Sequence, residues 1–232
     1  MTRDTVFIND DRFYQWREMY LVGVTTALKL GYPKIWFEKW AAGQMADAVL
    51  AQPMRAWSRE ELIAVAALKR GAAAEHGTDR HDQLELLGGG AEIDHPEINE
   101  WARIHQPEFL WSEAQVFNLD KGYAGTVDAI VRIGGKVYLM DLKTGNVRDA
   151  AIKLQLAAYK NAQFIGEGGK FIAPMPQVDA CGILTIPQKK ESSWGMYEVI
   201  VGNKEWEVFL GCLQTAQYQI EMKGFGILGR KI

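Results

Sequence analysis

The chain has 232 residues, 48% of them hydrophobic, which is enough to bury a full core as one domain of α/β or α+β type. Its net charge of -3 excludes attraction of the whole molecule to nucleic acid by bulk charge, so any phosphate-binding surface must be local. Cys181 and Cys212 are the only cysteines and have no partner at metal-ligand spacing, which argues against a zinc or iron–sulfur site built on thiolates. Without a leader-like segment or a long apolar run, we expect a cytoplasmic protein with no membrane partner.

The first half of the chain has mainly helical patterns. Residues 12–24 are rich in aromatic side chains and predict a short hairpin, and 25–31 predict a brief helix. A stronger helix is expected over 33–52. Ser58 with Glu61 three residues later forms a capping-box pattern, which predicts the start of a helix that continues to about residue 87.

The sheet is predicted to begin after Pro107. A short helix near 96–104 precedes it, and residues 109–119 have the pattern of a strand that ends in a turn at 120–122. Glu113 alternates with apolar neighbours on this strand. Two interpretations stay open, an additional carboxylate at a site or a charge at the edge of the sheet.

The segment 125–145 predicts the central hairpin. Gly134–Gly135 can adopt the positive φ angles that a two-residue turn needs, so the strands on either side should pair directly. If the turn holds only these two glycines, Asp128 lies across from Asp141 on one face of the sheet. Two carboxylates then meet.

Opposed like charges on neighbouring strands destabilise a sheet unless something offsets the repulsion. A divalent cation such as Mg²⁺ can do so, because it binds through one or two carboxylates plus waters and phosphates. Lys143, two residues after Asp141 on the same face, adds a positive group there. The alternative is a surface hairpin with solvated charges, but the flanking runs are apolar, which favours a functional site.

A helix is predicted over 147–165, leaving directly from the strand that carries Asp141. Its spacing places Arg148, Gln155 and Tyr159 on one stripe, which is either an exposed polar face or a part of the site. A local excess of basic residues also makes this region a candidate phosphate-binding surface: Lys143, Arg148, Lys153 and Lys160. Two further strands are expected within 177–201, and a packing helix over 204–223.

These residues together resemble the PD-(D/E)XK nuclease superfamily, and within it the RecB-like exonucleases of the compact phage type. The resemblance covers about residues 77–159. Its matching pieces are Gly77–Thr78 with His81 and Glu85, Gly125–Thr126–Val127–Asp128, Asp141–Leu142–Lys143–Thr144–Gly145, and Gln155 with Tyr159. Val127 stands where the superfamily name has proline, and two cysteines cannot build the four-cysteine cluster of some relatives, so no iron–sulfur cluster is expected.

The resemblance implies a role for each matched residue. His81, Asp128 and Asp141 would bind Mg²⁺ or Mn²⁺, joined by the Leu142 backbone carbonyl and, if it belongs to the site, Glu113. Lys143 would orient or activate the attacking water, and Gln155 and Tyr159 would position the substrate or Lys143. The residues expected to contact DNA are Thr144, Arg148 and Lys153.

The implied fold is a restriction-endonuclease-like core, a central mixed sheet flanked by helices. We expect a single nuclease domain over 1–232, with a mainly helical part at 1–106 and the sheet core at 107–232. The implied function is a metal-dependent DNA exonuclease in phage DNA recombination, repair or processing, with a recombinase or helicase as a possible partner. A structure-specific endonuclease and a non-catalytic DNA-end-binding module are the alternatives, and the oligomeric state is left open.

Overall fold

The structure is a computed structural model, and the residues it describes are 5–8, 11–32, 35–144, 150–186 and 194–225. Its helices, in chain order, are α1 (Val24–Gly31), α2 (Ile35–Ala51), α3 (Arg59–Gly88), α4 (Pro96–His105), α5 (Ala151–Lys160) and α6 (Asn203–Phe225). The strands are β1 (Thr5–Ile8), β2 (Asp11–Trp16), β3 (Met19–Gly23), β4 (Glu108–Asn118), β5 (Tyr123–Ile133), β6 (Lys136–Lys143), β7 (Phe164–Glu167), β8 (Lys170–Pro174), β9 (Ala180–Thr185) and β10 (Gly195–Val199).

All of these strands belong to one mixed sheet with β5 at its centre. β4 pairs with β5 along one side of β5. The other side pairs in parallel with β3 at Tyr123 and Ala124, and antiparallel with β6 from Ala129 onward. β6 then continues in parallel with β9. The predicted fold class, a central mixed sheet flanked by helices, is confirmed by this arrangement.

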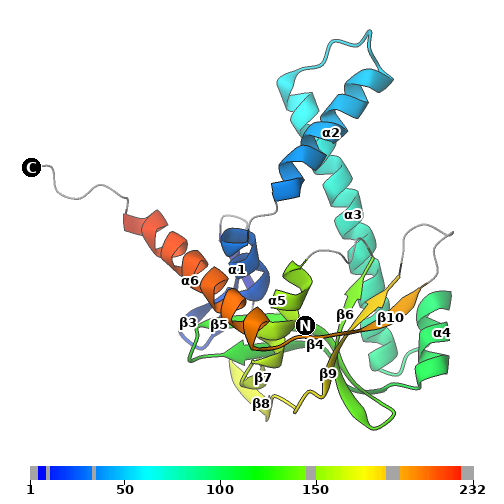
Figure 1. The fold of residues 1–232 in the computed structure, drawn as a ribbon, viewed down its shortest axis with the longest axis vertical. Coiled ribbons are helices and arrows are strands. Elements are labelled where there is room, and N and C mark those ends of the chain that lie inside the picture. Colours follow the sequence, from blue (N-terminus) through cyan, green and yellow to red (C-terminus); the bar gives the residue numbers. More distant parts are fainter. Residues whose placement is uncertain (1–4, 9–10, 33–34, 145–149, 187–193, 226–232) are drawn as a thin grey trace, which may run out of the picture.

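The two faces of the sheet carry different helices (Figure 1). On one face, α1, α5 and α6 cover a core that includes Leu28, Leu156 and Phe209. On the other, α4 and the end of α3 cover a second core around Ile98 and Trp101. These two layers bury both faces of the central strands, so a charged side chain there is removed from solvent unless a gap opens beside it.

The first part of α3 and the whole of α2 form a helical hairpin that projects away from the sheet (Figure 1). The predicted capping box begins α3: Ser58 Oγ accepts from the Glu61 N–H, and the Glu61 carboxylate accepts from the Ser58 N–H at 2.8 Å. Side chains here are largely exposed, with Met54 at 98%. Among the described helices, none is both long enough and apolar enough to cross a membrane.

Three expectations about the elements were wrong. The strands β1, β2 and β3 belong to the N-terminal segment and still join the sheet, so the sheet is not confined to 107–232. The helix expected over 147–165 begins at Ala151 and ends at Lys160. Its last predicted residues instead form β7, because Phe164 pairs with β4 and is buried between aromatic rings.

Candidate active site

The central hairpin has the predicted register. Gly134 and Gly135 take positive φ angles of 55° and 83°, and Ile133 pairs with Lys136 directly across the turn. Regular pairing of the two strands then continues to Ala129 and Met140. One position further along, Asp128 would lie opposite Asp141. The regular pairing ends there, because β6 continues beside β9 while β5 continues toward β3.

Asp128 lies at the point where the two strands separate. Its carboxylate replaces the lost ladder contact: Oδ2 accepts a hydrogen bond of 2.6 Å from the Leu142 N–H. On the side that faces β9, the Lys143 backbone carbonyl accepts a hydrogen bond from the Ile186 N–H. Because alternate residues of a strand direct their polar groups to opposite sides, the Leu142 N–H and carbonyl face the β5 side, where Asp128 lies.

Asp141 is buried, with 1% of the residue exposed, and it forms an ion pair with Lys143. The Lys143 Nζ lies 2.6 Å from Asp141 Oδ2 and keeps 26% of its side chain exposed. A buried carboxylate requires such a partner to stay charged. The cation predicted to lie near Asp141 is therefore in contact with it.

Helix α5 brings Tyr159 and Gln155 to the same place. Tyr159 packs so closely on β5 that a Cβ at Gly125 would lie 2.5 Å from its ring. Gln155 Nε2 donates to the Tyr159 hydroxyl at 3.1 Å. Burial, with smaller contributions from the negative charges of Asp128 and Asp141, raises the pKa of Tyr159 well above its ordinary value. The phenol therefore stays protonated and close to both aspartates.

Two further polar residues extend this row along β5. Thr126 lies two residues before Asp128, and its Oγ1 is 3.0 Å from the hydroxyl of Tyr14, which comes from β2. Tyr14 also contributes to the raised pKa of Tyr159. Sequence reasoning missed Tyr14, because only the fold brings β2 beside β5.

Glu113 lies beside Asp128. It sits between the two residues of β4 that pair with Ala129 and Val127, so Asp128 is its neighbour across the ladder. Its φ of 48° is in the left-handed region, which is unusual for a glutamate inside a strand and costs on the order of 1–3 kcal/mol. Such strain is found mostly where a side chain is directed toward a functional site. Glu113 is thus not at an edge remote from the aspartates.

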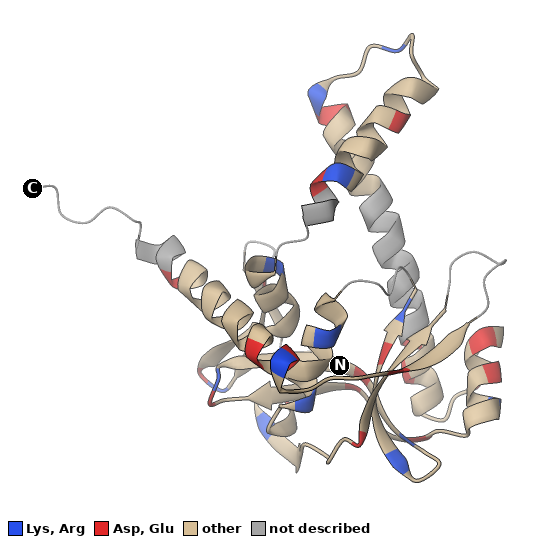
Figure 2. Ribbon diagram, viewed as in Figure 1, with Lys and Arg blue, Asp and Glu red and all other residues tan. Residues whose placement is uncertain are grey.

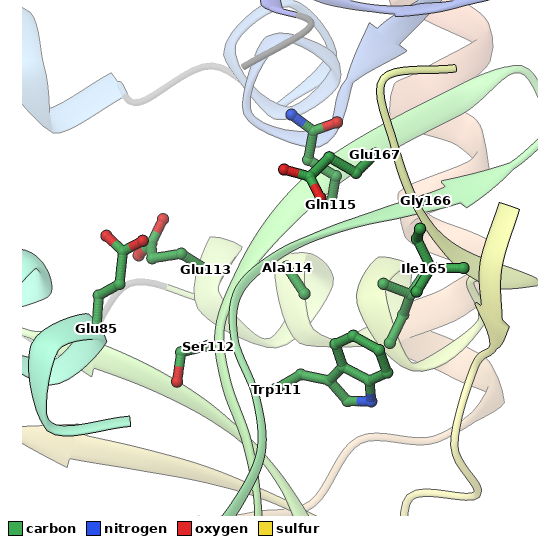
Figure 3. A pocket seen from close by; sticks show the side chains of 10 residues that line it. Glu85, Trp111, Ser112, Glu113, Ala114, Gln115, Ile165, Gly166 and Glu167 are labelled. Carbon is green, nitrogen blue, oxygen red and sulfur yellow. The ribbon is translucent and has the colours of Figure 1, made fainter. Parts of the chain in front are cut away.

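Glu113 also lines a cleft of about 570 Å³. Glu85 at the end of α3 is on the same side of this cleft, and the two carboxylates point toward the same space (Figure 3). The approach of α3 to β4 is close, because a Cβ at Gly88 would clash with Ser112 Oγ. In the sequence, Glu85 is marked only by the resemblance, together with His81. Its alignment with Glu113 depends on tertiary packing.

The remaining predicted residues are only partly described. His81 lies within α3, but its side chain is outside the described part, and Arg148 is outside it entirely. Thr144 is half-buried directly after β6. Lys153 is exposed on α5, which begins at Ala151, and the first predicted positions of this helix, 147–149, lie outside the described residues.

The described residues offer oxygen ligands, the type of ligand that a hard divalent cation prefers. Asp128 and Asp141 offer carboxylates and Leu142 a carbonyl, and Mg²⁺ commonly takes one or two carboxylates and keeps several waters. Within the described residues, no three His, Cys, Asp or Glu side chains gather as a complete ligand set. Figure 2 shows acidic and basic positions interspersed over the coloured helices and strands.

Three solved structures have a chain path similar to that of this protein over most of its length. No family model matches, and neither does any curated protein. A solved alkaline exonuclease from Laribacter hongkongensis is 7% identical, with a TM-score of 0.48, covering 88% of this chain and 89% of that one. A structure of the same exonuclease with dAMP has 9% identity and a TM-score of 0.47, over 88% and 89% of the two chains.

The crystal structure of SSO0001 is 15% identical, with a TM-score of 0.41, and the match covers 87% of this chain and 75% of that one. Similarity at this level assigns no activity, so the function has to be inferred from the chain's own side chains.

Proposed function

We propose that the protein is a Mg²⁺- or Mn²⁺-dependent deoxyribonuclease that hydrolyses DNA from an end. The observation that carries this proposal is the group formed where β5 and β6 separate: Asp128 bound to the Leu142 N–H, and Asp141 paired with Lys143. A purely structural ion pair does not need a second carboxylate, a buried phenol and a strained glutamate beside it.

Each residue has a chemical task in this proposal. Asp128, Asp141 and the Leu142 carbonyl would hold the cation, with His81 as the further ligand that the resemblance implies. When bound, such a cation lowers the pKa of a coordinated water and stabilises charge on the phosphate. Lys143 offsets negative charge beside the attacking water and can orient it. Tyr159 and Gln155 limit where Lys143 and the substrate can lie.

The finer parts of the proposal concern substrate and setting. Thr144, Arg148 and Lys153 are proposed to bind the DNA backbone, since they follow Asp141 along the chain and include two cations. We also propose a role in phage DNA recombination, repair or processing, in the cytoplasm of the host, with a recombinase or helicase as a partner.

The test compares two aspartates that make the same kind of hydrogen bond to the backbone of β6. Asp128 and Asp179 each accept a hydrogen bond from a backbone N–H of β6, at Leu142 and at Val137 respectively. Asp128→Asn should abolish cleavage of end-labelled linear DNA in Mg²⁺, whereas Asp179→Asn, the matched change at the far end of the strand, should leave the rate unchanged. Full activity in Asp128→Asn would overturn the assignment.

The same assay separates the alternatives. An exonuclease degrades the linear DNA with Mg²⁺ or Mn²⁺, stops with chelator, and leaves a closed circle intact. Cutting of the circle would instead identify an endonuclease. Salt-dependent binding of DNA ends without turnover under any metal condition would identify a binding module.

A further inference from the structure

The sheet face that carries Asp141 continues sideways from β6 onto β9 and β10 (Figure 1). Ile183 of β9 lies directly beside Asp141, and Tyr197 of β10 lies directly beside Ile183. Residues that pair directly on neighbouring strands have their side chains on the same face of the sheet. Tyr197 therefore shares a face with Asp141, at a distance of two strand spacings, or about 10 Å.

The helices cover only one end of this face. There, Leu139 of β6 and Val199 of β10 pack into the core beneath α1, α5 and α6. Toward the other end, Lys143, Thr185 and Gly195 form a row across the three strands, and all of them are half-buried. The face therefore opens to solvent beside Lys143, on the side where β10 lies.

The ring of Tyr197 is held in place by its own strand. Its hydroxyl end lies where a side chain at Gly195 would be, because a Cβ at Gly195 would come within 2.8 Å of the hydroxyl oxygen. The Thr185 hydroxyl donates to the Gly195 carbonyl at 3.1 Å, which ties β10 to β9 at this point. Tyr197 is nevertheless 58% exposed. An exposed ring in a fixed position can stack on a ligand at a small cost in ordering.

The charges around Tyr197 suit a nucleic-acid strand. Lys143 lies on the same face and keeps 26% of its side chain exposed. Glu198, which follows Tyr197 in β10, points to the opposite face, because successive side chains of a strand alternate. Its carboxylate accepts a hydrogen bond of 3.5 Å from the Tyr138 hydroxyl there. The carboxylate that follows the ring in the sequence is therefore directed away from a phosphate at Lys143.

We infer that Tyr197 stacks on a nucleobase of the DNA strand whose phosphate is bound at Asp141 and Lys143, an inference that rests on the proposed nuclease function. Stacking on an aromatic ring tolerates any sequence, because every base has a π face. The spacing of about 10 Å between β6 and β10 corresponds to roughly three nucleotides at a stacked rise of about 3.4 Å. Tyr197 thus binds a base near the reacting phosphate and takes no part in hydrolysis.

The first experiment measures the affinity of short labelled single strands by fluorescence anisotropy in chelator, so that cleavage plays no part. Tyr197→Leu should weaken binding about tenfold, the loss expected for one stacked base. Tyr197→Phe keeps the ring and should bind like the wild type. Tyr218→Leu, the matched change at a tyrosine of α6 that is 63% exposed, should also bind like the wild type. Wild-type affinity in Tyr197→Leu, or an equal loss in Tyr197→Phe, would overturn the inference.

A second experiment identifies the stacked base. One abasic nucleotide is placed in turn at each position near the end of the strand, and binding is compared between the wild type and Tyr197→Leu. The wild type should bind more weakly when the stacked base is missing, and in Tyr197→Leu this penalty should disappear at that position alone. Equal penalties in the two proteins at every position would show that no base stacks on Tyr197.

Failure of the proposed nuclease function would be a separate result, in which linear DNA survives in Mg²⁺ and Mn²⁺. The comparison of the Tyr197 variants in chelator requires no cleavage. It therefore still decides whether this ring binds a base.

Discussion

At the scale of single residues, the Asp141–Lys143 pair has two properties that a surface ion pair lacks. Asp141 is almost completely buried, and the distance between the charged atoms is 2.6 Å. In a low-dielectric surrounding, removing one partner leaves an uncompensated charge and costs about 3–5 kcal/mol. Any substitution of Lys143 therefore has to be separated into its effect on folding and its effect on chemistry.

The Lys143→Arg substitution separates the effect on folding from the effect on the reaction. The guanidinium keeps a positive charge beside Asp141, so the melting temperature should stay within a few degrees of the wild type, whereas Lys143→Ala should lower it clearly. The cleavage rate of Lys143→Arg should fall by about 100-fold or more, because a bulkier, always-charged group cannot replace a compact ammonium beside a water. Lys136→Arg, at the exposed start of the same strand, is the control. A normal rate in Lys143→Arg would remove Lys143 from the mechanism.

Cys181 gives a prediction about pH. Burial raises the pKa of its thiol from 9.0 to about 11, so the folded protein keeps this thiol protonated and unreactive at pH 8. Since the folded pKa is the higher one, the stabilisation is present below pH 9 and is lost as the pH rises toward 11. Thiol labelling at pH 8 should proceed at Cys181 only after unfolding in urea, and fast labelling of native protein would contradict this.

At the scale of elements, the site depends on the point along β5 at which its partner strand changes from β3 to β6. Its side away from β4 pairs with β3 at Ala124 and with β6 only from Ala129 onward. In the described residues between these two points no strand pairs on that side, and Thr126 and Asp128 lie there. The ring of Tyr159 packs against the same segment at Gly125. A hairpin alone, without β3 and α5, would leave the two aspartates on an ordinary ladder.

Gly125→Ala tests this packing. The added Cβ would meet the Tyr159 ring at 2.5 Å, and overpacking of this kind costs about 1–3 kcal/mol. We expect a lower melting temperature and a lower cleavage rate, because the Tyr159 ring must shift from its place against Gly125. Gly43→Ala is the control: a Cβ there meets nothing within 4 Å, and alanine favours the helix, so stability should rise slightly. Unchanged stability in Gly125→Ala would show that α5 adapts freely.

At the scale of the whole molecule, charge is spread rather than concentrated. The chain carries 26 basic and 29 acidic residues, and Figure 2 shows the two signs interspersed. In the proposed nuclease, contacts with phosphates are then expected from a few cations near the site, such as Lys143 and Lys153. This differs from a polycationic DNA-binding protein, whose affinity depends on many such contacts.

The salt dependence of DNA binding measures this difference. With two or three phosphate contacts, the slope of log K against log salt should be about -2 to -3 for duplex DNA, measured by anisotropy in chelator between 50 and 200 mM salt. Lys153→Ala should make the slope less steep by about one. A wild-type slope near -8 would show that a much larger basic surface takes part.

Local patterns in the sequence predicted a good part of the fold. The Gly134–Gly135 turn, the capping box at Ser58 and the strand over 109–119 were all predicted, because turn chemistry, capping and alternation act over a few residues. The strand at Phe164 was not. It depends on pairing with β4 and on the aromatic residues around it, which lie far away in the sequence.

The candidate site also combines features that the sequence predicts with features that depend on long-range packing. The sequence by itself determined the register of the hairpin as far as the pair Ala129–Met140, because a two-residue turn sets which residues lie opposite each other. Only the tertiary structure decided that the ladder opens at Asp128, that Tyr14 and Tyr159 approach there, and that Tyr197 shares this face of the sheet. These features require β3, β9 and α5 to pack against strands far from them in the chain, and such long-range packing leaves no periodic pattern in the sequence.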